Sequence, residues 1–67
     1  MNNTKILVID WCSKEFTTLE APDQNEAIRT LEQIGKALSY EADPCFKRQG
    51  GHTVGIQTDT MTWEIMQ

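Results

Sequence analysis

The sequence is poor in residues that cross-link a small fold, bend its chain or carry positive charge. Its 67 residues include two cysteines and two prolines, and 6 basic residues stand against 10 acidic ones. Cys12 and Cys45 are too few for the disulfide framework of a small secreted domain. A single disulfide between them remains an alternative to free thiols. The formal net charge of -4 disfavours a general nucleic-acid binder, which needs a basic face to neutralise phosphates.

Long apolar runs are also lacking. The N-terminal run covers only Ile6–Ile9, whereas a bilayer span needs about 20 apolar residues and a signal peptide about 7–15. We therefore expect a cytoplasmic protein with reduced thiols. A chain this short buries only about 60% of its unfolded surface, so we predict one small domain, residues 1–67, with a thin core and no large substrate pocket.

An amphipathic helix is predicted after Pro22. Asp23 and Glu26 have the spacing of a capping box, in which each side chain bonds a backbone N–H at the other position. Pro44 blocks continuation, so we expect the helix to span Asp23–Glu41. Apolar residues recur at helical spacing within and just beyond this range. They are Ala27, Ile28, Leu31, Ile34, Leu38 and Ala42.

The opposite face of the helix is polar, with Glu32 four positions before Lys36, the order that favours an ion pair. Gly35 falls inside the apolar stripe. Glycine costs up to about 1 kcal/mol relative to alanine in a helix, so its presence predicts close packing against a sheet.

Two strands are expected before the helix. Lys5–Trp11 carries apolar side chains on both faces, as in a central, well-covered strand. A polar turn at Cys12–Glu15 leads to a returning strand, Phe16–Ala21. Phe16 and Leu19 have opposite parity, so we expect that strand to be bulged or short.

Period-two patterns return after the helix. We predict strands at Cys45–Gln49, around residues 53–57, and at Met61–Met66, with a hairpin at Gly50-Gly51 and a turn at Thr58–Thr60. The fold class is therefore α+β, a single antiparallel β-sheet of four to five strands with one amphipathic helix on one face, in the order ββαββ(β).

Catalytic and metal chemistry have little support. Cys12, Cys45 and His52 are too few and too far apart for structural zinc, which takes four ligands, usually in close pairs. A nucleophilic set of Cys45, His52 and Asp10 or Asp43 lacks a flanking signature and oxyanion donors. We predict no metal, no other cofactor and no enzyme activity.

One basic cluster stands out, Lys47-Arg48-Gln49-Gly50-Gly51-His52. Its glycines would let backbone amides approach a phosphate, but it lacks the spacing of a P-loop and opens no helix. Lys47, Arg48 and His52 are the candidate contacts of an alternative function, a small nucleotide- or nucleic-acid-binding module. A solvated hairpin tip that protects an edge strand is the simpler interpretation.

Carboxylates and aromatic residues point to a partner-binding surface. Acidic side chains on one face would imitate phosphates and occupy a basic groove, although acidic surfaces also keep small proteins soluble. Exposed Trp and Tyr are typical of binding hot spots, and the alternative places Phe16 and Trp63 in the core with Trp11 at its edge. The candidate partner-binding residues are Glu26, Glu32, Trp11, Tyr40, Asp43 and Glu64.

The stretch Phe16–Ile28 (FTTLEAPDQNEAI) runs from a strand through a polar capping segment into an amphipathic helix. This plan resembles small phage-encoded inhibitors, including compact anti-CRISPR proteins and phage inhibitors of host RNA polymerase. It also resembles the opening of HicB-type antitoxins, without their separate DNA-binding element after the core. The resemblance implies a protein that blocks a larger nucleic-acid-handling machine, and it assigns no site residues.

The leading hypothesis is a small acidic phage or mobile-element protein that inhibits a host nucleic-acid-handling machine, such as a CRISPR-Cas-type complex, by direct protein binding. Glu26 and Glu32 would pair with target Lys or Arg, and Trp11 or Tyr40 would be the apolar anchor. It would act in the cytoplasm of a host bacterial cell on a protein or ribonucleoprotein, without binding nucleic acid directly. A third hypothesis is a homodimer closed through the Met61–Met66 strand.

Overall fold

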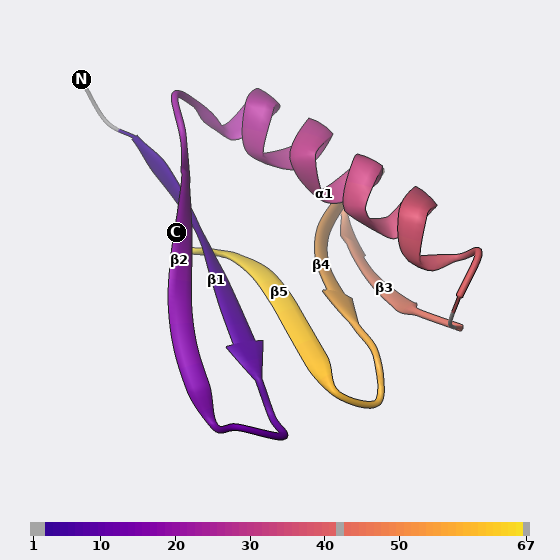
Figure 1. Cartoon of the computed structure of the whole chain (residues 1–67). Helices are drawn as coiled ribbons and strands as arrows, with labels where there is room; N and C mark the ends of the chain where they lie inside the picture. Colours follow the sequence, from indigo (N-terminus) through magenta and orange to yellow (C-terminus); the bar gives the residue numbers. More distant parts are fainter. Residues whose placement is uncertain (1–2, 42, 67) are drawn as a thin grey trace.

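The computed structural model describes residues 3–41 and 43–66. Its elements are β1 (Thr4–Asp10), β2 (Glu15–Ala21), α1 (Gln24–Leu38), β3 (Cys45–Gln49), β4 (His52–Gln57) and β5 (Met61–Met66). The strands form one antiparallel sheet in the order β2-β1-β5-β4-β3, and α1 crosses one face of it (Figure 1). The predicted α+β architecture is confirmed, with all five strands present.

β2 differs from its prediction. It pairs with β1 over seven consecutive residues, from Thr4 opposite Ala21 to Asp10 opposite Glu15, without a register shift. The expected bulge or shortening is therefore wrong. Phe16 and Leu19 point to opposite faces of a regular strand, and both are exposed, by 65% and 43%. An edge strand tolerates this pattern because neither of its faces has to be fully buried.

β5 lies in the interior of the sheet. It pairs with β1 along its whole length and with β4 over Thr62–Glu64. β5 therefore lies between β1 and β4, although β4 pairs with only three of its six residues. Closure of a homodimer through Met61–Met66 stays a prediction. Sequence periodicity predicts that a segment is a strand but carries no information on which strands flank it.

The helix begins as predicted and ends earlier. The Asp23 carboxylate accepts a bond of 2.9 Å from the Glu26 N–H, while the Glu26 carboxylate contacts Arg29 at 3.1 Å, so half of the capping box forms. The last helical residue is Leu38 and not Glu41, because the N–H groups of Tyr40 and Glu41 bond carbonyls three residues back instead of four. The Ser39 hydroxyl donates to the Lys36 carbonyl at 2.7 Å. Ala42, expected at the end of the apolar stripe, lies outside the described residues.

The ion pair that the spacing of Glu32 and Lys36 favours does not form. Between Glu32 and Lys36 no ion pair forms in the described structure, where the only two ion pairs are Glu26–Arg29 and Lys47–Glu64.

Over residues 3–41 and 43–66, no helix has both the length and the apolar character that a membrane crossing requires.

The core lies between α1 and the sheet. Ile6, Leu31 and Ile56 are its largest fully buried side chains, and burial of each contributes about 1.5–3 kcal/mol. Gly35 lets the helix approach closely, since a Cβ at that position would overlap the Phe46 ring and lie 3.3 Å from the Ile56 Cδ1 atom. The predicted reason for this glycine is confirmed.

Glycines also shape the β3–β4 hairpin. Gly50 and Gly51 form its two-residue loop with φ of 61° and 79°, the left-handed values that tight hairpins require. Pairing then skips Val54, because Lys47 faces Gly55 while Arg48 faces Thr53. The hairpin signal is confirmed, and a bulge follows it.

Candidate interaction surface

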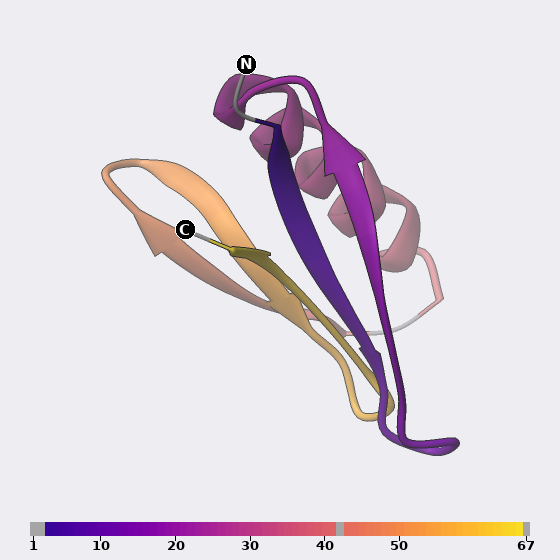
Figure 2. The same ribbon diagram turned by 90° about the vertical axis from the view of Figure 1, so that its left-hand side faces the viewer.

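One face of the sheet has no covering element among the described residues. In Figure 2, α1 lies behind β1 and β2, and nothing covers these strands on the near side. We call this side the open face. By strand alternation and the pairing register, its residues are Lys5, Leu7, Ile9, Phe16, Thr18, Glu20, Cys45, Lys47, Gly55, Gln57, Thr62, Glu64 and Met66.

Apolar side chains gather at the β1–β2 end of the open face. Phe16 lies opposite Ile9 in the register, and Leu7 is two residues before Ile9 on the same face. The Trp11 indole N–H donates to the Thr62 hydroxyl at 2.8 Å, which holds the ring beside this group. We call Leu7, Ile9, Trp11 and Phe16 the apolar strip. Leu7 and Ile9 are half-buried, and Trp11 and Phe16 are exposed by 48% and 65%.

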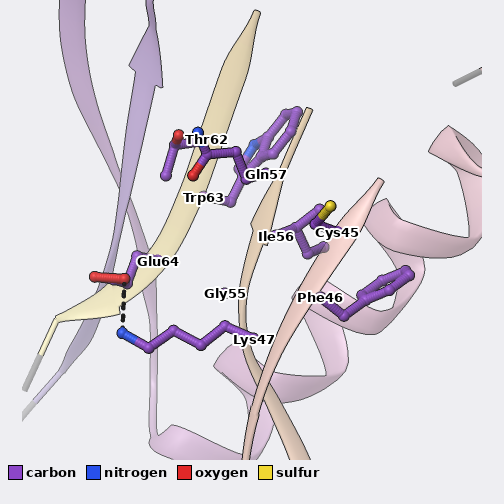
Figure 3. A pocket seen from close by; sticks show the side chains of 9 residues that line it. All are labelled: Cys45, Phe46, Lys47, Gly55, Ile56, Gln57, Thr62, Trp63 and Glu64. Atoms are coloured by element: carbon purple, nitrogen blue, oxygen red, sulfur yellow. Dashed lines mark hydrogen bonds and ion pairs between the residues drawn. The ribbon is translucent and has the colours of Figure 1, made fainter. Parts of the chain in front are cut away.

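The opposite end of the open face is hollowed and carries an ion pair (Figure 3). Lys47 on β3 reaches over Gly55 on β4 to Glu64 on β5, with 3.2 Å between the Lys47 Nζ and Glu64 Oε1 atoms. Both side chains are well exposed, so the pair contributes at most about 1 kcal/mol. The hollow gathers one charge of each sign and therefore has no net charge from this pair.

The predicted partner-binding carboxylates do not share a face. Glu26 and Glu32 lie on α1, and Glu26 is paired with Arg29. Glu64 lies on the open face, on the other side of the sheet from the helix. Asp43 lines hollows with Asp59 beside the β4–β5 turn. A single carboxylate array that imitates phosphate spacing is therefore not assembled by these residues.

The two predicted aromatic anchors are also separate. Trp11 belongs to the apolar strip, whereas Tyr40 follows the helix and is 82% exposed. Of the residues assigned to the core in the alternative interpretation, Trp63 does pack against the buried cluster, but Phe16 is exposed.

The alternative cationic site is dispersed in the same way. Lys47 points along the open face to Glu64, while the Arg48 guanidinium lies 5.9 Å from the centroid of the Phe46 ring. His52 lines a hollow with Glu32 and other residues of α1. The three side chains therefore do not converge on one phosphate-sized position.

The thiols and the histidine of the candidate catalytic and metal sets lie apart in the structure. Cys12 and Cys45 are free and exposed. Cys45 and His52 lie at opposite ends of the β3–β4 hairpin, where Cys45 pairs with Gln57 and His52 pairs with Gln49. Across the described part of the chain, no group of three or more His, Cys, Asp or Glu side chains is placed to hold a metal ion.

Part of the exposed apolar surface was not predicted from the sequence. The large exposed hydrophobic residues are Trp11, Phe16, Leu19, Tyr40, Phe46 and Met66. Only Trp11 and Tyr40 were expected to bind a partner. The opposite parity of Phe16 and Leu19 was the available signal, because apolar residues on both faces of a regular strand cannot both face a one-sided core.

Homology offers no guide to this surface. No family model, curated protein or solved structure matches the chain.

Proposed function

We propose that the protein is a binding module that inhibits a larger nucleic-acid-handling assembly by occupying one of its protein surfaces. The observation that supports this is the apolar strip on the open face, where the exposed Trp11 and Phe16 side chains lie beside Leu7 and Ile9. Full burial of a side chain such as Phe contributes about 1.5–3 kcal/mol, and aromatic anchors dominate the energy of many interfaces.

The surroundings of the strip suit a protein partner. Glu20 lies opposite Lys5, and Glu64 lies opposite Leu7 on the neighbouring strand. Charged groups therefore border an apolar centre, which is the usual anatomy of an interface. The net charge of -4 favours a basic target, whose approach it would accelerate.

This mechanism differs from phosphate imitation. With Glu26 and Glu32 on the helix side and Glu64 on the open face, one flat partner contacts only part of the carboxylate set. We assign the acidic residues to long-range attraction and the apolar strip to affinity.

Affinity capture from a bacterial lysate, with and without nuclease, tests the proposal. We expect a stoichiometric protein partner that survives nuclease and is lost with Phe16→Thr, which keeps a strand-forming residue but removes the anchor. Tyr40→Ser is the matched control, because it removes an exposed aromatic side chain away from the strip. Capture that disappears with nuclease, or that Phe16→Thr leaves unchanged, would contradict the proposal.

A further inference from the structure

We propose that the free edge of β2 is a strand-docking site, which an extended basic segment of a partner protein joins as an antiparallel sixth strand. The identity of that partner as the inhibited assembly rests on the proposed function. The docking geometry rests on β2 itself.

β2 is open for pairing along its length. It is the outermost strand on its side of the sheet, and β1 pairs with it over all seven residues. Every residue from Glu15 to Glu20 is exposed. In an antiparallel edge strand, backbone N–H and C=O groups of alternate residues point away from the sheet and can pair with another chain.

The other edge strand of the sheet is protected, and β2 is not. β3 has only five residues, carries Lys47 and Arg48, and pairs with a bulged strand. Short length, basic side chains and bulges are the devices that keep edges from pairing. β2 is seven residues long and regular, and it contains no Lys, Arg or Pro. The two edges of one sheet therefore differ in their capacity to accept a strand.

Charge favours a basic segment over a second copy of this chain. The charged residues of β2 are Glu15 and Glu20, one near each end. Two copies paired through β2 would bring four carboxylates to one seam and oppose two chains of net charge -4. A strand with Lys or Arg opposite these carboxylates instead forms favourable cross-strand pairs.

The faces of β2 define the order of residues in the docked strand. Phe16, Thr18 and Glu20 lie on the open face. An antiparallel strand therefore places a basic residue opposite Glu20 and, four positions later, an apolar residue opposite Phe16. That apolar residue would extend the apolar strip. The docked strand would therefore pair with the β2 backbone and cover part of the strip at the same time.

A blocked synthetic peptide provides the probe. Its core is Arg-Val-Thr-Val-Ile-Lys, flanked by Ser-Gly at both ends, so that Arg opposes Glu20, Ile opposes Phe16 and Lys opposes Glu15. In an amide NMR titration, we expect saturable shifts centred on Glu15–Glu20 and new protection of β2 amides from hydrogen exchange. Binding should weaken at least tenfold in Glu15→Lys/Glu20→Lys, and a peptide with Glu in place of Arg and Lys should bind that variant.

Two further variants serve as a substitute and a control. Glu15→Gln/Glu20→Gln removes both charges with little change of shape and should also weaken peptide binding. It provides the test if the lysine variant fails to fold. Glu41→Lys makes one of the same charge reversals just after α1, at an exposed carboxylate that no proposed contact uses, and should change peptide affinity much less than the changes at Glu15 and Glu20.

The inference is overturned if the peptide does not bind at millimolar concentration, if its shifts fall outside β2, or if both glutamate variants bind it as well as the wild type. It is also overturned if sedimentation shows that β2 pairs with a second copy and excludes the peptide. The proposed function can fail separately. If the peptide docks on β2 but no protein is captured from the lysate, the proposed function is refuted and the docking site is not. If a protein is captured equally well by Glu15→Lys/Glu20→Lys, the β2 docking site is refuted and the proposed function is not.

Discussion

Gly35 determines how closely α1 approaches the β3–β4 hairpin. The Phe46 ring and the Ile56 side chain occupy the space where a side chain at this position would lie. Helix propensity favours alanine over glycine by about 1 kcal/mol, so the local preference of the helix and the packing of the sheet oppose one another here. Packing is the stronger term, because overfilling a packed site commonly costs about 1–3 kcal/mol.

We therefore expect Gly35→Ala to lower the free energy of unfolding by about 1 kcal/mol in urea denaturation. In a Phe46→Ala background the ring is gone, and the same substitution should stabilise the protein through helix propensity. A stabilising Gly35→Ala in the wild-type background would show that the ring moves aside at little cost.

At the scale of the element, α1 depends on its N-terminal cap. Among the described helical contacts, the Asp23 carboxylate is the side-chain acceptor for the Glu26 N–H, a bond that satisfies one of the unpaired donors of the first turn. The second half of the capping box is replaced by the exposed Glu26–Arg29 ion pair, which contributes little.

Asp23→Ala should lower the free energy of unfolding by about 1 kcal/mol. Glu32→Ala removes another exposed carboxylate of the helix and should change it by less than about 0.5 kcal/mol. Equal effects of the two substitutions in thermal or urea unfolding would mean that charge, and not the cap, stabilises the helix start.

Local pattern predicted the elements well, because periodicity and turn chemistry are properties of neighbouring residues. Asp23, Gly50 and Gly51 indicated a helix start and a hairpin that the structure confirms. At the early helix end, the Tyr40 and Glu41 N–H groups bond carbonyls three residues back, a choice of partner that residue propensity does not register. The apolar strip was not predicted, because the apolar residues on both sides of β1 indicated a strand that is covered on both faces, and a pattern cannot show that only one face has a cover.

At the scale of the whole molecule, the sheet is joined unevenly. β1 shares seven pairs with β2 and six with β5, whereas β4 meets β5 only at Gly55–Gln57 with Thr62–Glu64. The β3–β4 hairpin is therefore attached to the rest of the sheet by a short seam, and α1 is its main additional support.

Native-state hydrogen exchange should reveal this difference. We expect amides of β3 to exchange through openings of lower free energy than those of β1, because regions with few cross-strand pairs open without global unfolding. Phe46→Ala should lower the free energy of opening measured at the β3 amides further. At the β1 amides, the free energy of opening should fall only as much as the free energy of global unfolding does. Equal protection of β1 and β3 would show that the short seam does not divide the sheet.

The interior position of β5 has a consequence for synthesis. Ribosomes make β5 after the four other strands, yet it is the strand that joins the two hairpins into one sheet. Until it emerges, β1 and β4 have no strand to pair with between them, and the β1–β5 contacts are far apart in sequence, which slows folding. The same unfilled place between β1 and β4 would accept foreign strands, so we expect the growing chain to be most open to misassembly just before β5 arrives.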